Sequence, residues 1–436
     1  KRFVNACHEY GLAVVLDVVY NHFGPEGQVN GRFGEYHNDR FRTPWGEALN
    51  FDAAGSAEVR HFFLENARQW ITEFHVDALR LDAVHAIFDL SAYPFLAELT
   101  DTVRAEAERS GRRALVMAES NLNNPRMIRP KKVGGYGFDA QWLDDFHHAI
   151  HGLLTGETRG YYADYGDLEQ LAKCYREAFI FTGEYSAYRR CRYGAPAEDA
   201  DFHQFVACIQ NHDQIGNRLK GDRLGALVNL ETQKLAAAAL LAGPFVPLLF
   251  MGEEYGDPAP FPYFVSVTNP VLAKAIRIGR KQEFAAFGWE SDPPDPQAVS
   301  TFESARLNLH LREQSPHRQL LQFYRKLLSL RSELRLGATD RDRIGVSTLI
   351  DDDAIMMVRH EHRPAPVALV LYFARAAGTL QLPLPAGQWQ VVLDTADLEW
   401  AGPGSRCPPF LTVDARAELR VAPRSAILLT QTVAAQ

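Results

Sequence analysis

The sequence predicts an α/β protein: a (β/α)8 barrel (TIM barrel) without its first strands, followed by a C-terminal all-β domain. Apolar runs alternate with helical segments up to about residue 330, and polar residues follow the ends of several of these runs. From about Gly337 the helical period stops and alternating β-type segments begin. We therefore expect a barrel domain at residues 1–336 and a β domain at residues 337–436.

The barrel strands are predicted from runs such as Leu12–Tyr20, a continuous apolar segment of the kind that is buried on both faces of a parallel sheet. The expected strands are 12–20, 76–81, 114–118, 138–142, 205–210 and 245–250, and the expected helices are 2–10, 58–74, 95–108, 167–178, 232–241 and 319–330. A complete barrel has eight strands. Because the chain opens at Lys1 in what reads as mid-helix, we expect the first two strands to precede it.

The β domain is predicted from short strand-forming segments separated by Gly and Pro. These segments are 346–350, 354–359, 367–373, 389–394 and 426–430. Such closely spaced strands without helices between them are typical of an all-β domain.

The composition narrows the class of partner. The 436 residues are 46% hydrophobic, carry a net charge of −8 and contain no basic tract interleaved with aromatics, so we expect a neutral substrate and no nucleic-acid partner. No apolar stretch reaches the roughly 20 residues of a membrane span, so we expect no membrane partner. The five cysteines are scattered without a CxxC pair, which is typical of thiols in a reducing, cytoplasmic compartment.

Two carboxylates at strand ends are candidates for acid–base chemistry. Asp82 ends one predicted strand, and Arg80 lies two residues earlier on the same face, where it would keep the aspartate ionised. Glu119 ends the next strand, whose largely apolar end would raise the pKa of Glu119, as an acid catalyst requires. An ionised and a protonated carboxyl group about 5–5.5 Å apart can hydrolyse a glycosidic bond with retention. The sequence therefore predicts a retaining glycoside hydrolase with Asp82 as nucleophile and Glu119 as general acid/base.

Further polar residues end neighbouring strands. Asn21-His22 and His212-Asp213 supply imidazoles and a carboxylate that can hydrogen-bond sugar hydroxyls. The aromatic residues expected to stack on hexose rings are Tyr20, Phe23, Tyr136, Trp142, Tyr185 and Tyr188. Each signal alone also has a structural explanation, since a strand-end Asp is more often a helix N-cap, Asn21-His22 fits a turn, and Phe146 fits core packing. Their joint occurrence on successive strands favours the catalytic interpretation.

Four segments resemble, in order and spacing, the four sequence regions of the α-amylase superfamily of glycoside hydrolases. These segments are 17–22, 79–82, Glu119 after its apolar strand, and 211–213. The resemblance implies that Asp82 is the nucleophile, Glu119 the proton donor and Asp213 the transition-state stabiliser. It also implies that the C-terminal domain is a β-sandwich, and that His22, Arg80 and His212 line the subsite of the sugar under attack.

Finer motifs resemble the malto-oligosyltrehalose trehalohydrolase family. These motifs are 20–25, 80–85, 118–120, 139–142, 144–148, 210–217, 251–255 and 261–264. Members of that family release trehalose by cleaving the α-1,4 bond beside the terminal trehalose unit of malto-oligosyltrehalose. The resemblance therefore implies this substrate, or a related α-glucan, and a metabolic link to a malto-oligosyltrehalose synthase. The implied substrate-binding residues are His22, Arg80, Leu81, Ala83, Val84, His85, Asp144, Asp145, Phe146, His147, His148, His212, Gln214, Ile215, Gly216 and Asn217.

Four positions depart from the pattern of that family. Asn121 and Asn124 stand where the family commonly has aspartates, and Val267 and Asn269 replace an expected His and Asp. None of these changes removes a catalytic group. The loss of two anionic acceptors near Glu119 would change its surroundings or the fit of the trehalose end of the substrate.

Two other functions stay open. An α-1,4-glucan branching or debranching enzyme would share the carboxylate set, and a catalytically inactive glucan-binding module would usually lack one or more of the carboxylates, all of which are present here. We expect no cofactor, because carboxyl groups carry the chemistry. We also expect no metal, because no acidic loop of the calcium-binding type is found.

Overall fold

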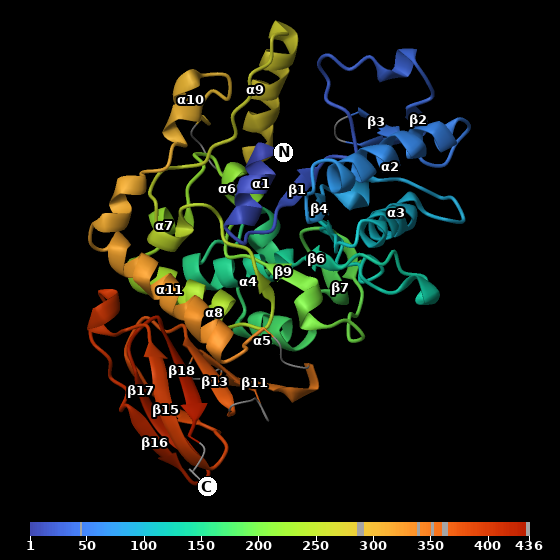
Figure 1. Cartoon of the computed structure of the whole chain (residues 1–436). Coiled ribbons are helices and arrows are strands. Elements are labelled where there is room, and N and C mark those ends of the chain that lie inside the picture. Colours follow the sequence, from blue (N-terminus) through green and yellow to red (C-terminus); the bar gives the residue numbers. More distant parts are fainter. Residues whose placement is uncertain (44–45, 286–291, 338–340, 350–352, 360–364, 433–436) are drawn as a thin grey trace. The chain divides into compact units, whose positions relative to one another are not determined.

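The computed structural model describes residues 1–43, 46–285, 292–337, 341–349, 353–359 and 365–432 (Figure 1). The chain divides into two compact units. Unit 1 comprises Lys1–Trp142 and Tyr193–Ala200, and unit 2 comprises Leu143–Arg192 and Asp201–Gln436. Within the described ranges, no helix combines the length and the apolar character that a membrane crossing requires.

Unit 1 is built on a parallel sheet. Its strands, in spatial order, are β1 (Val15–Val18), β4 (Ala78–Leu81), β5 (Leu115–Ala118) and β6 (Ala140–Trp142). The other elements are α1 (Arg2–Glu9), α2 (Ser56–Thr72), α3 (Phe95–Arg109) and the antiparallel pair β2 (His37–Thr43) and β3 (Gly46–Leu49). α2 packs against α3, and the buried rings of Phe51 and Phe95 stack with centroids 4.2 Å apart (Figure 1). The predicted parallel sheet is thus confirmed.

The sheet of unit 1 is open at β1. This strand pairs with β4 on one side, and the residues that the structure describes provide no partner on the other. Val15 in this strand is accordingly 50% exposed. The described strands therefore do not close into the predicted barrel.

Unit 2 begins with helices. They are α4 (Asp144–Thr155), α5 (Leu168–Glu177), α6 (His212–Gly216), α7 (Leu224–Leu227), α8 (Leu230–Leu241), α9 (Pro270–Ala285), α10 (Val299–Ser304) and α11 (His317–Glu333). Its strands before the C-terminal part are β7 (Thr182–Ser186), β8 (Cys191–Gly194, whose last two residues belong to unit 1), β9 (Phe205–Ala207) and β10 (Val246–Pro247). β9 and β10 pair in parallel.

β9 and β10 are shorter than the predicted strands 205–210 and 245–250. The carbonyl of Ile209 bonds the side chain of His147 instead of a neighbouring strand, and Pro247 has no N–H to donate to a ladder. The sequence also did not predict α4, α6, α7, α9 or α10.

The C-terminal part of unit 2 is antiparallel. Its main sheet has the order β11 (Ile344–Leu349), β12 (Ala354–Arg359), β13 (Val367–Tyr372), β18 (Ser425–Gln431), β15 (Gly387–Asp394) and β16 (Phe410–Val413), and β14 (Gly378–Leu382) pairs with β17 (Ala417–Val421). Trp389 is fully buried in the core between these strands, and its indole N–H donates to the Pro385 carbonyl at 2.9 Å. The C-terminal part is built of strands, as predicted, and the structure shows that they are antiparallel. Residue 350 of the predicted segment 346–350 lies outside the described residues, and β14, β16 and β17 were not predicted.

Candidate active site

Arg80 is the centre of a charged cluster at the sheet of unit 1. The register places Asp17 of β1 beside Arg80 of β4, and Asp82 lies two residues further along, on the same face as Arg80. The Arg80 side chain is only 4% exposed, yet its Nη1 donates to Asp17 at 2.6 Å and to Asp82 at 3.0 Å. Its Nη2 lies 3.1 Å from Glu119 Oε2. One guanidinium group therefore binds both predicted catalytic carboxylates.

The surroundings of Arg80 stabilise its positively charged form. Its guanidinium lies over the ring of Trp142 at 4.2 Å from the centroid, which is a cation–π contact. Although burial alone would lower it, the three surrounding carboxylates raise the pKa of Arg80. Trp142, expected to stack on a sugar, thus packs against the arginine in this structure.

The expected apolar environment of Glu119 is wrong. Besides Arg80, the backbone N–H of Ala83 donates to Glu119 Oε2 at 2.7 Å. Both contacts stabilise an ionised carboxylate. Ala83 adopts a left-handed conformation with φ of 39°, which is uncommon for a residue with a side chain. Ala83 itself is buried, and its backbone N–H contacts Glu119.

Asn21 holds the other side of Asp82. Its amide donates to the Asp82 carbonyl at 2.7 Å and to Asp82 Oδ2 at 2.8 Å, and its own Oδ1 contacts His22 Nδ1. Burial lowers the pKa of His22, and the nearby Asp82 carboxylate only partly offsets this effect. The structure thus brings His22, Arg80, Asp82 and Glu119 together. The structure also shows that Asn21, which the sequence placed at a strand end, holds Asp82 through two hydrogen bonds. The sequence did not predict this contact.

The rest of the segment that follows Asp82 is mostly buried. Leu81 and Val84 belong to the core of unit 1, and the Val84 N–H donates to the Glu119 carbonyl at 3.0 Å. His85 is partly exposed. Leu81 and Val84 therefore pack in the core next to the two carboxylates, and their contact with substrate stays a prediction.

In unit 2 the predicted segment 144–148 forms the start of α4. Asp144 is partly exposed, but Asp145 is buried, and its carboxylate accepts the N–H of Ile180 at 2.6 Å and the hydroxyl of Tyr165 at 2.6 Å. Phe146 is fully buried against aromatic rings of the core. Asp145 and Phe146 thus make internal contacts that hold the helix, and their role as substrate contacts stays a prediction.

A buried polar network continues along α4. His147 bonds the Ile209 carbonyl at 2.9 Å and the Tyr162 hydroxyl at 2.8 Å, so it too is internal. One turn later, His151 Nε2 lies 2.8 Å from Glu157, which also accepts two bonds from Arg218 at 2.7 and 2.8 Å. Although burial alone would raise it, the hydrogen bonds from Arg218 and His151 lower the pKa of Glu157 well below its ordinary value. Sequence reasoning missed this network, which ties α4 to the segment that follows α6.

The predicted segment 212–217 forms α6. Asn211 caps it by accepting the N–H of Gln214 at 2.8 Å. His212 and Asp213 have exposed side chains that approach within 3.7 Å of each other, and Gln214 is partly exposed. Ile215 is buried, whereas Gly216 and Asn217 accept hydrogen bonds from Arg280 at 2.7 and 3.0 Å. The second predicted group of site residues is therefore a short helix with exposed polar side chains.

The four departures from the resembled family have local structural roles. Asn124 accepts the Arg126 N–H at 3.1 Å, and Asn121 accepts the Tyr193 hydroxyl through its carbonyl. Asn269 accepts the Val271 N–H at 2.9 Å, and the Val267 N–H donates to a glutamine side chain. An aspartate would make the same contact at position 269.

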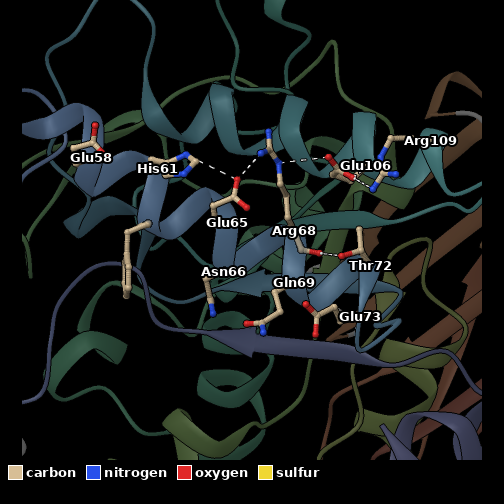
Figure 2. Close-up of a pocket in the computed structure, with 11 residues that line it drawn as sticks. Glu58, His61, Glu65, Asn66, Arg68, Gln69, Thr72, Glu73, Glu106 and Arg109 are labelled. Carbon is tan, nitrogen blue, oxygen red and sulfur yellow. Dashed lines mark hydrogen bonds and ion pairs between the residues drawn. The ribbon is translucent and has the colours of Figure 1, made fainter.

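A cavity of about 650 Å³ lies elsewhere on unit 1, along α2 and α3. Figure 2 shows that several of its charged side chains pair with one another. Arg68 contacts Glu65 and lies 3.5 Å from Glu106, which Arg109 approaches at 2.7 Å. None of the predicted site residues lines this cavity, so we do not assign the chemistry to it. Across the described ranges, no three His, Cys, Asp or Glu side chains are grouped to hold a metal ion.

The burial of His148 predicts acid sensitivity. Burial, with smaller contributions from His151 and Arg189, lowers the pKa of His148 from 6.5 to about 3. The folded protein keeps this imidazole neutral between these values, whereas the unfolded chain protonates it below about 6.5. We expect the free energy of unfolding to fall as the pH drops from 6.5 to 3, by up to about 1.4 kcal/mol per pH unit from this group.

Urea unfolding at pH 7 and pH 5 measures this effect. The His148→Gln variant is expected to lose less stability between the two pH values than the wild type. His203→Gln, which changes an exposed histidine, is the matched control and should behave like the wild type. Equal pH dependence of H148Q and wild type would contradict the prediction.

Several known proteins with the same name are similar to the chain. No family model matches the chain. The chain is 46% identical over 337 residues to malto-oligosyltrehalose trehalohydrolase of Saccharolobus solfataricus, an alignment that covers 77% of this chain and 57% of that protein. It is also 46% identical over 346 residues to the protein of the same name from Arthrobacter ramosus, covering 78% of this chain and 60% of that protein. The chain therefore spans less than two thirds of the length of these relatives.

Among solved structures, the chain resembles the crystal structure of a candidate α-amylase from Salmonella typhimurium. The two share 33% sequence identity with a TM-score of 0.85. The match covers 99% of this chain and 70% of the other.

Proposed function

Because the chain belongs to the α-amylase family of glycoside hydrolases, we propose that it cleaves α-1,4-glucosidic bonds with retention and releases trehalose from malto-oligosyltrehalose. The substrate follows from the relatives that share its sequence over more than three quarters of its length. The observation that carries the chemistry is the shared guanidinium of Arg80, which binds Asp82 at 3.0 Å and approaches Glu119 at 3.1 Å. Two carboxyl groups that contact the same guanidinium can lie about 5–5.5 Å apart, which is the distance between the catalytic carboxyl groups of retaining enzymes.

The proposed reaction has two steps. A carboxylate oxygen of Asp82 attacks the anomeric carbon while Glu119 gives its proton to the oxygen of the departing trehalose, which leaves a β-glucosyl ester on Asp82. Glu119 then takes a proton from water, and the water displaces Asp82 and frees the malto-oligosaccharide. The contacts of Glu119 with Arg80 and the Ala83 N–H favour its ionised form, which this second step uses.

Further groups are proposed to support these two. Asp213 is proposed to stabilise the transition state, and the substrate is proposed to contact side chains that are partly or fully exposed. These are His22, His85, Asp144, His212, Gln214 and Asn217. Exposure and polar character support this choice over the buried members of the same segments.

The finer architecture is part of the proposal. We infer that the parallel strands belong to a (β/α)8 barrel domain at residues 1–336, followed by a β-sandwich at 337–436. Carboxylates at the carboxyl ends of consecutive parallel strands support the barrel assignment. A metabolic partner that makes malto-oligosyltrehalose, a synthase, would supply the substrate.

Parallel incubation with maltopentaose and with its trehalose-capped analogue tests the proposed function. We expect kcat/KM to be at least about tenfold higher on the capped substrate, because a site shaped for the trehalose end loses hydrogen bonds when that end is missing. Free trehalose should be the product. New or lost α-1,6 linkages would instead identify a branching or debranching enzyme, and glucan binding without any product would identify an inactive binding module.

A further inference from the structure

We propose that a cavity in unit 2 binds a small molecule that carries a phosphate group. The cavity is lined by residues at the end of α4, the start of α8 and three loops of the C-terminal sheet. Its volume of about 570 Å³ lies within the roughly 300–1,000 Å³ typical of small-molecule sites. No predicted site residue lines it, so the proposal does not depend on the proposed hydrolase function.

Three arginines from separate loops line this cavity. Arg375 follows β13, Arg406 precedes β16, and Arg424 lies in the turn between β17 and β18. The backbone N–H of Arg424 donates to the Ala374 carbonyl at 3.0 Å, which fixes the turns of Arg424 and Arg375 side by side. The loop of Arg406 is held by the Ser405 hydroxyl, which donates to Asp394 at 2.6 Å. The fold therefore brings three arginines from separate loops to the lining of one cavity.

Much of this positive charge is not balanced by acidic side chains of the lining. Glu231 is the acidic residue in the lining, and Lys234 already pairs with it at 3.0 Å. The Asp353 carboxylate attracts the Arg424 guanidinium electrostatically, and Arg424 Nη1 donates a hydrogen bond to the Leu153 carbonyl at 3.3 Å. Burial, followed by repulsion from Arg375, lowers the pKa of Arg424. A bound anion would relieve this repulsion.

The other lining residues favour a phosphate over a sugar ring. α8 begins at this wall, and Asn229 caps it by accepting the Thr232 N–H at 3.0 Å, so the positive end of a 12-residue helix faces the same space. Guanidinium groups bind phosphate oxygens in a fork geometry. Among the described lining residues there is no aromatic side chain on which a sugar could stack. The shared chemistry thus points to the phosphate group, whether it is free or attached to a sugar.

Isothermal titration of the full chain with glucose 6-phosphate, inorganic phosphate and glucose tests the proposal. We expect saturable binding of at least one of the two phosphate probes at low salt, weaker binding as salt screens the arginines, and no binding of glucose at this cavity. The variant R375Q/R406Q changes two exposed side chains and is expected to bind at least about tenfold more weakly, which corresponds to about 1.4 kcal/mol.

The matched control is R416Q/R420Q, which removes two exposed arginines of the same domain that do not line the cavity. It is expected to bind the phosphate probe within about twofold of the wild type, because long-range charge effects are screened. The proposal is overturned if neither phosphate probe binds the wild type. It is also overturned if both double variants weaken binding equally, which would indicate only a general effect of net charge.

Discussion

Asp82→Asn is expected to lower kcat on malto-oligosyltrehalose by roughly four orders of magnitude or more, because an amide cannot form the glycosyl ester. Asparagine has nearly the same shape as aspartate, so the positions facing Arg80 and Asn21 stay filled. The chemical step should therefore be lost while the fold is kept. Initial rates of trehalose release, measured on wild type and variant at equal concentration, give the ratio.

Asp199→Asn is a suitable control for Asp82→Asn. Asp199 lies in the same unit, but it is half-exposed and pairs with Arg129 at 2.8 Å away from the Arg80 cluster. This variant should keep the wild-type rate, since exposed pairs contribute about 0–1 kcal/mol to stability. If D82N retained the wild-type rate while D199N behaved normally, the nucleophile would have to be another residue.

The part of the site that follows from strand periodicity could be predicted from the sequence. Residues two apart on a strand share a face, which correctly joined Arg80 to Asp82. Long apolar runs with polar residues at their ends also gave the parallel strands of unit 1. These signals are local in sequence and depend only on the geometry of one strand.

The surroundings of Glu119 could not be predicted in the same way. Its environment depends on the register between β4 and β5, which brings Leu81 beside Ala118 and so sets Asp82 and Glu119 next to each other. The Ala83 N–H bonds Glu119 across 36 residues of sequence, a contact that no local pattern indicates. The apolar strand therefore suggested apolar surroundings for the Glu119 carboxylate, whereas the structure places the buried Arg80 guanidinium beside it.

α4 was missed for a related reason. Its first five residues, Asp144–His148, are helix formers of only moderate propensity, and they were interpreted as a binding motif. In the structure their spacing puts Asp145 and His147 into internal hydrogen bonds. Residues 145–152 of α4 are all buried, so this helix has no regularly spaced exposed face that the sequence pattern could reveal.

Arg80→Leu is expected to be the most destabilising single change considered for unit 1. Removing one partner of a buried ion pair leaves the opposite charge without compensation, which lowers the free energy of unfolding by about 3–5 kcal/mol. Here one guanidinium serves Asp17, Asp82 and Glu119, so the leucine variant would hold three carboxylates together without their cation. Urea unfolding at pH 7 should show this loss, and hydrolysis should fall as well because both catalytic carboxylates lose their common anchor.

Arg126→Leu separates this ionic role from the loss of an arginine stacked on an aromatic ring. Arg126 lies over Tyr136 at 4.6 Å, much as Arg80 lies over Trp142 at 4.2 Å, but Arg126 is exposed, and its guanidinium donates to the backbone carbonyl of Gly134 at 2.9 Å. Its replacement should cost about 1 kcal/mol or less.

If R80L lost no more stability than R126L, the carboxylates would not depend on Arg80. The cluster would then be a set of separately solvated charges, and Arg80 would not be the group that positions the nucleophile and the acid. A loss several times larger for R80L, partly restored by adding Asp17→Asn, would show that the three carboxylates repel one another once the cation is gone.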